Sequence, residues 1–399
     1  MDESNLISCL MQRASLLPEV EVFVSGTQSM TFAEMNRRTS QFANALRSLD
    51  IGPGSRVAIL TKNQVECALL VFAAMKIGAV CVPINWRLSA EEIQFVLEDS
   101  SASMVVTDAE FSDRVSGAAE QSGMSVFVVD GAGRDGMRLD VWRASFDDHL
   151  ALRVISPDDE ALHIYSSGTT GRPKGVVLTH RGLLSACQAT SEAWNLDRDA
   201  LLGHALPMFH IAGILMVLSP VYMGCRCVTF REFQPEAFLS SLSSQKITHV
   251  LLMPVMINFL LSQPSSRKLD FGSLKHMAYG GSPITEPVLQ AAMEVFGCEF
   301  SQIYGLTEVS GVVTSLTPDD HRRGGLLRSA GRPMSRIALR IVDPVTLTDM
   351  EDGRVGEVWI RSDRSFKEYW RKPEATQDAY PEGRDATGGW FRSGDAGYL

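Results

Sequence analysis

The chain has 399 residues, of which 45% are hydrophobic and 21% charged, so it has the apolar content of a folded protein and a disordered chain is excluded. Because a single hydrophobic core stops growing at roughly 250 to 300 residues, we expect more than one structural unit. The 37 Lys and Arg residues against 47 Asp and Glu residues give a net charge of -10, which would repel a polyanion, so we expect no nucleic-acid partner.

The cysteines and the apolar segments bear on where the protein works. The seven cysteines are scattered, odd in number and without C-x-x-C or Cys/His ligand spacing, which predicts reduced, mostly buried thiols in a cytoplasmic protein. The start, "MDESNLISCLMQRA", lacks the basic and apolar regions of a secretory signal. The apolar run at residues 68–84 contains Lys76, and the run at 211–225 is broken by Pro220 and too short for a bilayer. We therefore expect no transmembrane segment.

Helices and strands alternate in the first third of the chain. The spacing of apolar residues in "TFAEMNRRTSQFANALRSL" predicts a helix, and "IGPGSRVAIL" then turns into a β-branched strand. A second unit repeats this order, with a helix over residues 65–76, the strand "GAVCVPIN" and a helix that begins with a capping box of Ser89 and Glu92. Two short strands, "MVVTD" and "SVFVVD", follow. Such alternation predicts parallel strands covered by helices, the α/β class.

The predicted secondary structure changes from alternating helices and strands to short strands near the end of the chain. "DGAGRDGMR" at 130–138 is typical of a surface loop, and "EALHIYSSGTTGRPKGVVLTH" predicts a strand, a glycine-rich loop and another strand. Two more α/β units are expected between about 200 and 305. From about 325, "RIALRIVDP", "GEVWIRS" and "GWFRSGDAGYL" predict short strands separated by turns. We therefore expect two helix-covered, mostly parallel-sheet subdomains within residues 1–324 and a small β-barrel-like subdomain over 325–399.

The loop at 165–177, "YSSGTTGRPKGVV", has the composition of a phosphate-binding loop or of a solvated turn. It is not a Walker A loop, because Pro173 stands where that pattern needs glycine and a strand follows instead of a helix. Its backbone amides, hydroxyls and one cation could still surround phosphate oxygens. The candidate residues for this are Ser166, Ser167, Gly168, Thr169, Thr170 and Lys174.

Four segments together resemble the AMP-forming adenylating superfamily, which comprises acyl-CoA synthetases, peptide-synthetase adenylation domains and beetle luciferases. Residues 165–175 match its signature "[YF]-[ST]-[ST]-G-[ST]-[ST]-G-x-P-K-G", and "AYGGSPI" at 278–284 looks like its adenine-binding turn. "QIYGLTE" at 302–308 looks like its Y-G-x-T-E motif, and "GWFRSGDAGYL" at 389–399 like its ribose-binding motif. The resemblance covers nearly the whole chain and is strongest to fatty-acyl and aryl-CoA ligases.

The resemblance implies that a carboxylate attacks the α-phosphorus of ATP to give an acyl-adenylate, after which a thiol displaces AMP. It assigns the pyrophosphate portion to the glycine-rich loop, the α-phosphate to Thr307, Mg²⁺ to Glu308 and the ribose hydroxyls to Asp395. The adenine would stack on Tyr304 and lie against the backbone of Gly280, Gly281 and Ser282.

Two residues of the resemblance concern the acid. "LPMFHIAGI" carries the family's histidine beside the acyl pocket, so His210 would gate the pocket or orient the carboxylate, although a lone histidine in this setting could equally be a core residue. Ile303 stands beside the acyl tunnel, near Gly280, where several relatives have glycine, and its branched side chain would shorten or redirect the tunnel.

The chain departs from the family in two places. Glu368 in "SFKEYW" replaces a glycine that often precedes the Tyr-Trp pair, which predicts a different local turn because a positive φ angle at a residue other than glycine costs roughly 1 to 2 kcal/mol. Family members continue past the ribose motif into a hinge and a mobile C-terminal domain with a catalytic lysine, whereas this sequence stops at Leu399. We expect this chain to bind nucleotide and to adenylate slowly.

The acid is the least defined element. "HIAGILMVLSP" is apolar where amino-acid-activating domains usually place an aspartate, so the resemblance implies a fatty, alicyclic or aryl carboxylic acid with CoA as the acceptor. A ligase that loads a carrier-protein thiol stays open as an alternative. Two other classes also stay open, a nucleotide-binding module without catalysis and a light-emitting relative of luciferase. The sequence does not specify the acid, its chain length, the pathway or the oligomeric state.

Overall fold

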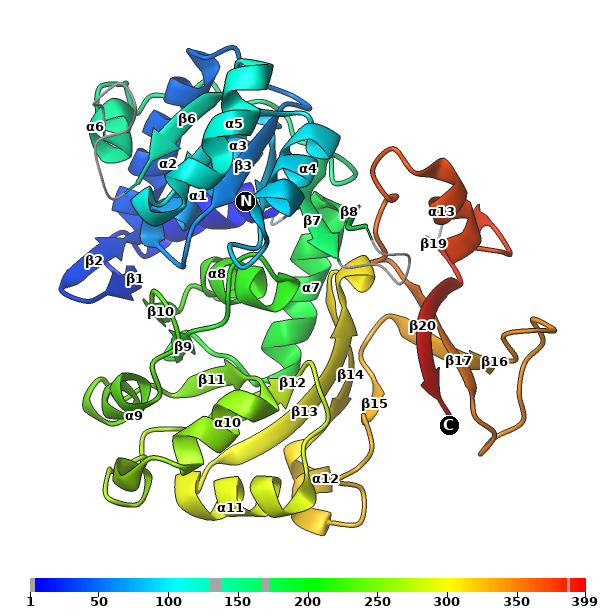
Figure 1. Ribbon diagram of the computed structural model, residues 1–399. Helices are drawn as coiled ribbons and strands as arrows, with labels where there is room; N and C mark the ends of the chain where they lie inside the picture. The colour runs from blue at the N-terminus through cyan, green and yellow to red at the C-terminus, as the bar shows by residue number, and fades with distance from the viewer. Residues whose placement is uncertain (1–3, 130–137, 167–171, 386–387) are drawn as a thin grey trace.

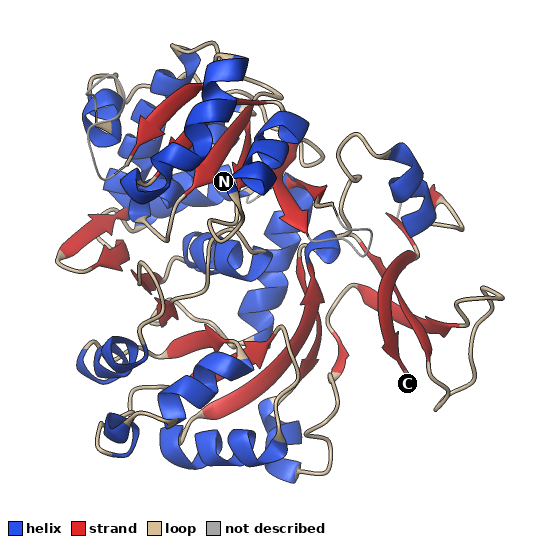
Figure 2. Cartoon of the chain, in the orientation of Figure 1, coloured by secondary structure: helices blue, strands red, loops and turns tan. Residues whose placement is uncertain are grey.

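The computed structural model describes residues 4–129, 138–166, 172–385 and 388–399. It has two sheets with helices on their faces and a smaller lobe formed by the C-terminal residues (Figures 1 and 2). The predicted α/β class is confirmed. The surface loop expected at 130–138 lies almost wholly outside the described residues.

The first sheet has six strands in the order β6-β5-β3-β4-β7-β8, and all neighbours are parallel except β7 and β8. Its strands are β3 (Arg56–Leu60), β4 (Val80–Pro83), β5 (Ala102–Thr107), β6 (Ser125–Val128), β7 (Glu160–Ser166) and β8 (Lys174–Thr179). The antiparallel pair β7–β8 places the ends of the glycine-rich loop side by side, since Ser166 pairs with Lys174.

The second sheet has nine strands in the order β15-β14-β13-β12-β11-β9-β10-β1-β2. They are β1 (Glu21–Ser25), β2 (Gln28–Thr31), β9 (Leu201–His204), β10 (Arg226–Thr229), β11 (His249–Leu252), β12 (His276–Gly280), β13 (Glu299–Leu306), β14 (Gly311–Leu316) and β15 (Arg332–Pro333). The strands from β1 to β13 in this order are parallel, and β2, β14 and β15 pair antiparallel at the two edges. The N-terminal hairpin β1–β2 thus joins a sheet whose other strands come from far along the chain.

Helices from both halves of the chain contact one another between the two sheets (Figure 1). These are α1 (Leu6–Leu16), α2 (Phe32–Arg47), α3 (Val65–Ile77), α7 (His180–Ala193) and α8 (Ile211–Met223). The outer faces carry α4 (Ala90–Ser100), η1 (Ala109–Phe111), α5 (Ser112–Ser122), α9 (Pro235–Ser244), α10 (Pro254–Leu261), η2 (Pro264–Arg267), α11 (Glu286–Phe296) and α12 (Pro318–Arg323), while α6 (Leu139–Ala144) packs against α2. The capping box predicted for Ser89 and Glu92 is present at the start of α4.

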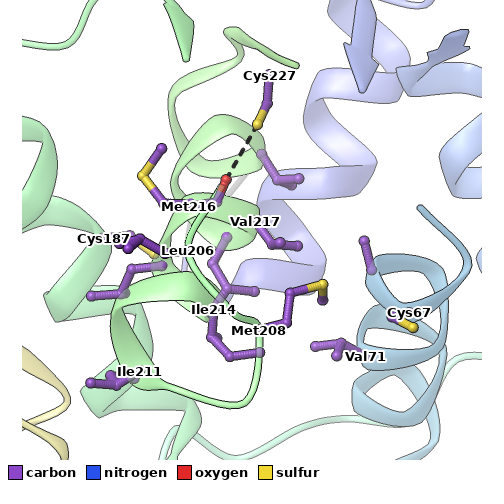
Figure 3. Packing of buried hydrophobic residues seen from close by; sticks show 14 of the residues in the cluster. Cys67, Val71, Cys187, Leu206, Met208, Ile211, Ile214, Met216, Val217 and Cys227 are labelled. Atoms are coloured by element: carbon purple, nitrogen blue, oxygen red, sulfur yellow. Dashed lines mark hydrogen bonds between the residues drawn. The ribbon is translucent and has the colours of Figure 1, made fainter. Parts of the chain in front are cut away.

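Helix α8 contains Pro220 and continues past it. Proline has no N–H and therefore leaves the carbonyl four residues earlier without its helical partner. Here that carbonyl belongs to Met216, and the Cys227 thiol donates to it over 3.6 Å (Figure 3). The helix consequently stays continuous within the core, where its buried side chains pack against α7 and α3 (Figure 3).

The C-terminal lobe contains a three-stranded antiparallel sheet of β16 (Ile337–Val342), β17 (Gly356–Ser362) and β20 (Phe391–Gly397), and a short pair, β18 (Arg384–Asp385) and β19 (Gly388–Gly389). The small antiparallel sheets expected for this region are confirmed. The sequence did not predict α13 (Pro373–Ala379), because seven residues are too few for a helical period to show. Tyr380, directly after α13, packs on Phe366 and Phe391, which holds the helix on the lobe.

Residues 364–370 attach this lobe to the two sheets. The buried guanidinium of Arg364 donates to the carbonyl oxygens of Val312 on β14, over 2.9 Å, and of Ser335, over 3.3 Å. Further along, Lys367 N donates to Val177 O over 2.8 Å, and Val177 N donates to Glu368 O over 3.0 Å, so the segment pairs with β8. Glu368 has no positive φ angle, which fits the different local turn predicted for it. Within the described residues, no helix has both the length and the apolarity that crossing a membrane would need.

Candidate active site

The predicted motif residues lie where strands of both sheets end. Strand β12 ends at Gly280, and β13 leads directly into the short helix η3 (Thr307–Val309). Strands β7 and β8 flank the glycine-rich loop, and residues 364–370 pair with β8. In open parallel sheets, ligands bind at the carboxyl ends of the strands, so the motifs stand at the edge where a ligand is expected.

The glycine-rich loop is visible at its two ends. Ser167, Gly168, Thr169 and Thr170 lie outside the described residues, whereas Ser166 and Lys174 pair across β7 and β8. The hydroxyl of Tyr165 donates to Asp99 Oδ2 over 2.7 Å, and its ring covers Gly175 so closely that a Cβ there would come within 3.0 Å of it. Because real Cβ atoms rarely tolerate that distance, this packing accounts for the glycine of the Lys174-Gly175 pair.

A tyrosine from the C-terminal lobe lies between two of the predicted phosphate-site residues. The Tyr369 hydroxyl donates to Glu308 Oε1 over 3.0 Å, and Lys174 Nζ lies over the Tyr369 ring, 5.1 Å from its centroid. A cation over an aromatic face is attracted by the ring electrons. Tyr369 therefore fixes the carboxylate of Glu308 and the ammonium of Lys174 in relation to each other.

Glu308 is held in a protein environment that disfavours its charge. Desolvation by burial raises the pKa of the Glu308 carboxyl, and the Tyr369 hydroxyl and the nearby Lys174 lower it in part. The main-chain oxygen of Glu308 accepts a hydrogen bond from Phe366 N over 2.7 Å, which locks the backbone of η3. A bound cation would stabilise the charged form of the Glu308 carboxylate, because it would compensate for the solvation that the carboxylate has lost.

Tyr304 and Asp395, assigned to the two parts of a nucleoside, meet although 91 residues separate them. The Tyr304 hydroxyl donates to Asp395 Oδ2 over 2.6 Å. Burial and the neighbouring Asp395 carboxylate both raise the pKa of the Tyr304 phenol. The structure thus brings the Y-G-x-T-E segment of β13 and the SGD segment of β20 to one place.

The end of β12 and the turn after it contain Gly280, Gly281 and Ser282, the residues predicted to lie against adenine. A Cβ on Gly280 would stand 2.3 Å from the main-chain oxygen of Ile303, so only glycine allows β12 and β13 to approach here. Gly281 has a φ angle of +79°, and it and Ser282 are exposed. The backbone of this turn is therefore bare on its outer side, where a flat base could lie against it.

A mainly apolar cavity of about 270 Å³ opens beside these residues. Four predicted substrate or phosphate residues line it, namely His210, Gly280, Ile303 and Thr307. The remaining lining comes from the end of α7, the residues between β9 and α8, the start of α8, β11 and the residue after it, Gly281 after β12, Gly305 of β13, and β14. No Asp or Glu is among the described residues that form its wall. The cavity therefore suits an apolar group, with polar partners at its mouth.

His210 caps the start of α8 at this mouth. Its φ and ψ angles of -103° and 149° are those of an N-cap residue, and its side chain is exposed on one side and packs against the Phe209 ring on another. Burial and the nearby Arg87 guanidinium lower the pKa of the His210 imidazole. His210 is therefore not a core residue, and its neutral imidazole is available to a ligand at neutral pH.

Sequence reasoning missed several residues of the site. Tyr369 belongs to the Tyr-Trp pair of "SFKEYW", but nothing local in the sequence indicates its contact with Glu308. Thr190 of α7 and Trp194, the residue after that helix, line the cavity, although nothing local in "QATSEAW" indicates a pocket wall. The described residues contain no cluster of three or more His, Cys, Asp or Glu side chains suited to a metal ion.

Comparison with known proteins agrees with this geometry. A family model described as "AMP-binding enzyme" matches residues 10–370. The chain is 36% identical over 400 residues to the long-chain-fatty-acid–CoA ligase FadD13 of Mycobacterium tuberculosis, covering 98% of this chain and 75% of that protein. It is 32% identical over 380 residues to the fatty acid–[acyl-carrier-protein] ligase ScoC of Streptomyces coeruleorubidus, covering 93% of this chain and 70% of that protein.

A solved structure is also similar over the full length. The inhibitor-bound N-terminal domain of FACL13 from Mycobacterium tuberculosis superposes with a TM-score of 0.89 at 32% identity, covering 99% of this chain and 96% of that chain. The likeness therefore extends over both sheets and the C-terminal lobe, including the segments that meet at the cavity mouth.

Proposed function

Because the chain belongs to the AMP-binding enzyme family, we propose that it uses ATP to convert a hydrophobic carboxylic acid into an acyl-adenylate, whose acyl group then passes to the thiol of CoA. The acid is a fatty, alicyclic or aryl carboxylate, since an unpaired ammonium group would be costly in a cavity whose described wall has no carboxylate. The observation that carries the proposal is that Lys174, Glu308, Tyr304 and Asp395 gather at the mouth of this cavity.

The chemistry requires two anions to meet. A carboxylate oxygen forms a bond to the α-phosphorus while the bond from that phosphorus to pyrophosphate breaks, so positive charge and hydrogen-bond donors must surround the phosphates. In the proposal, Thr307 contacts the α-phosphate from the cavity mouth, and Lys174 with the hydroxyls of the glycine-rich loop holds the pyrophosphate. The adenine stacks on Tyr304 against the backbone of 280–282, and Asp395 accepts hydrogen bonds from the ribose.

Mg²⁺ fits the site only together with the nucleotide. Mg²⁺ usually binds one or two carboxylates and completes its shell with phosphate oxygens and water. Glu308 offers one half-buried carboxylate near Lys174, and the described residues include no cluster of three or more His, Cys, Asp or Glu side chains that could hold a metal ion. In the proposal, Glu308 would hold Mg²⁺, which would neutralise phosphate charge when bound.

His210 and Ile303 act on the acid. In the proposal, the neutral imidazole of His210 at the cavity mouth orients the carboxylate toward the α-phosphorus. Ile303 narrows the cavity beside Gly280, because the two residues are already in contact distance. In the proposal, His210 affects the rate of adenylation, and Ile303 affects the size of the acid that the cavity accepts.

Calorimetry with this chain tests the proposal. We expect ATP and an acyl-sulfamoyl-adenosine, a stable mimic of the acyl-adenylate, to bind with one-to-one stoichiometry, and the mimic to compete with ATP. An acid panel scored by acid-dependent AMP release then identifies the preferred acid. Absence of binding by both compounds would contradict the proposed function.

A carrier-protein thiol is a second candidate for the acceptor, because ScoC, named as an acyl-carrier-protein ligase, is 32% identical to this chain. Acyl transfer to CoA and to a phosphopantetheinylated carrier protein can be compared directly by following thioester formation. Faster transfer to the carrier would replace CoA in the proposal and leave adenylation unchanged.

A cytoplasmic location also stays a prediction, supported by seven cysteines that are all free thiols.

A further inference from the structure

The far end of the cavity is formed where α7 ends. Thr190, in the last turn of α7, and Trp194, the C-cap residue that follows the helix, both line the cavity. The main chain of Trp194 lies beside His249, the first residue of β11, whereas Met253 follows the other end of β11 and lines the cavity near Gly281. The length of β11 therefore separates Thr190 and Trp194 from the mouth.

These two residues carry buried donors without acceptors. Thr190 is 0% exposed and Trp194 is 1% exposed, and among the described residues neither Thr190 Oγ1 nor Trp194 Nε1 has a hydrogen-bond partner. An indole N–H can only donate, and a hydroxyl can donate as well as accept. A buried donor that stays unpaired is unfavourable, so such groups usually meet an acceptor from a ligand or from water.

Most side chains in the described wall of the cavity are hydrocarbon. Besides Thr190 and Trp194, the cavity is bordered by residues such as Leu206, Leu215, Leu251 and Val312. Two donors in a mainly apolar wall would discriminate strongly between ligands, because a ligand that lacks the matching acceptor leaves them unpaired in a dry environment. A molecule that fills the cavity can supply the missing acceptor.

The size of the cavity indicates what fits inside it. A cavity of roughly 150 Å³ holds a benzene ring, and this cavity has a volume of about 270 Å³. It therefore has room for a ring with a short linker to the carboxylate.

We propose that the acid is a compact aromatic acid that carries an oxygen acceptor at the end remote from its carboxylate, and that Thr190 and Trp194 are the residues that select it. The inference rests on the proposed function, since it names the substrate class of that same site. The hydroxyl of Thr190 and the indole N–H of Trp194 donate to the distal oxygen, while the carboxylate faces His210 and Thr307 at the mouth.

A matched pair of adenylate mimics tests this directly. The 3-(4-methoxyphenyl)propanoyl and 3-(4-ethylphenyl)propanoyl sulfamoyl-adenosines have nearly the same shape and differ by an ether oxygen in place of a methylene. We expect the methoxy compound to bind at least 10-fold more tightly by calorimetry. An ethyl compound that binds equally well or better would overturn the inference, because water or nothing would then satisfy the two donors.

Variants assign the preference to these residues. In Thr190→Val, which keeps the shape, and in Trp194→Phe, the preference should fall to less than about 3-fold, whereas Thr190→Ser should keep it. Ser191→Ala is the matched control, since Ser191 is also buried on α7 but does not line the cavity. A 10-fold preference that persists in both Thr190→Val and Trp194→Phe would overturn the assignment.

The same titrations separate this inference from the proposed function. If ATP binds and both aryl mimics bind with equal affinity, or only a palmitoyl mimic binds, the inference is wrong and the adenylating site stands. If neither ATP nor any mimic binds, the proposed function itself fails. The wild-type comparison decides the inference even if a variant does not fold.

Discussion

At the mouth of the cavity, polar contacts and charges join residues from three segments, namely Lys174 of β8, Tyr304 and Glu308 of β13 and η3, and Asp395 of β20. At the far end, Thr190 and Trp194 stand in an apolar wall and have no partners among the described residues. The mouth is preorganised by polar contacts, whereas the far end is defined by shape and by what its occupant must supply. Changes at the mouth should therefore affect every acid alike, and changes at the far end should alter which acid is chosen.

The largest expected effect is at Glu308. We predict that Glu308→Gln lowers the rate of acid-dependent ATP–pyrophosphate exchange by about 100-fold for all acids, because loss of one preorganised charge at developing phosphate charge typically costs this much. Glu374→Gln, which changes an exposed carboxylate on α13, is the control and should keep the rate within about 2-fold. If the effect of Glu308→Gln differed from one acid to another, the claim that the mouth does not select the acid would be wrong.

Glu308→Gln should lower activity but stabilise the folded protein at high pH. Burial raises the pKa of Glu308 in the folded state above its unfolded value, so the folded protein binds this proton more tightly, and stability is lost as pH rises through the two values. Glu308→Gln removes that loss. We expect the melting temperature of the ligand-free protein to be higher than wild type at pH 8 and equal or lower at pH 4. A difference in melting temperature that does not change with pH would contradict the inference that the charged Glu308 carboxylate destabilises the folded protein.

The next effect concerns the contact between Tyr304 and Asp395. We expect Tyr304→Phe and Asp395→Asn each to weaken ATP binding by about 10-fold, and the double variant to lose less than the sum, with a coupling energy of about 1 kcal/mol, because the two groups share a charge-assisted hydrogen bond of 2.6 Å. Tyr398→Phe, in an exposed tyrosine of the same segment, is the control. Additive losses in calorimetry would show that the two residues bind the nucleoside independently.

An effect on acid preference, similar in size, is expected where the two regions meet, at Ile303. We predict that Ile303→Ala enlarges the cavity and shifts the ratio of affinities toward adenylate mimics that are one or two methylenes longer by about 10-fold, since each buried methylene is worth about 0.8 kcal/mol. ATP affinity should change by less than about 2-fold. Val313→Ala, in a buried residue of β14 outside the cavity wall, controls for general loosening of the sheet. A loss of ATP affinity in Ile303→Ala would place this residue with the mouth.

The mouth was largely predictable from the sequence because its chemistry is written in short segments. Thr307 and Glu308 follow Tyr304 within one strand end, and a carboxylate in a glycine turn at Asp395 carries the ribose assignment. The position of Thr307 and Glu308 follows from the end of β13, which is parallel to β12. Asp395 lies on β20 of the separate antiparallel sheet, so its meeting with Tyr304 depends on how the C-terminal lobe docks. The hydroxyls of 167–170 belong to the same prediction, and they lie outside the described residues.

The far end was not predictable because it depends on packing between segments that are distant in sequence. Thr190 and Trp194 become cavity residues only when α7 lies against β14, and no local pattern reports this contact. The same applies to the hairpin β1–β2, which joins the second sheet beside β10 about two hundred residues later. Tyr369 illustrates the intermediate case, since its residue type was visible but its partner Glu308 was fixed by the docking of residues 364–370.

The smallest expected effect tests whether the far end depends on shape alone. Helix α8, which lines the cavity through Ile211 and Leu215, continues past Pro220 because the Cys227 thiol donates to the freed oxygen of Met216. We expect Cys227→Ala to lower the free energy of unfolding in urea by about 1 kcal/mol more than Cys225→Ala, since both remove a buried thiol but only the first leaves that carbonyl unpaired.

Binding in these two variants completes the argument. Neither thiol reaches the cavity, so the affinities for ATP and for an acyl-sulfamoyl-adenosine should stay within about 2-fold of wild type in Cys225→Ala and Cys227→Ala. If Cys227→Ala weakens the acyl mimic while ATP binding is unchanged, then the hydrogen bond to Met216 sets the position of α8 and thereby the shape of the cavity. Equal unfolding free energies in the two variants would instead show that α8 tolerates Pro220 without this bond.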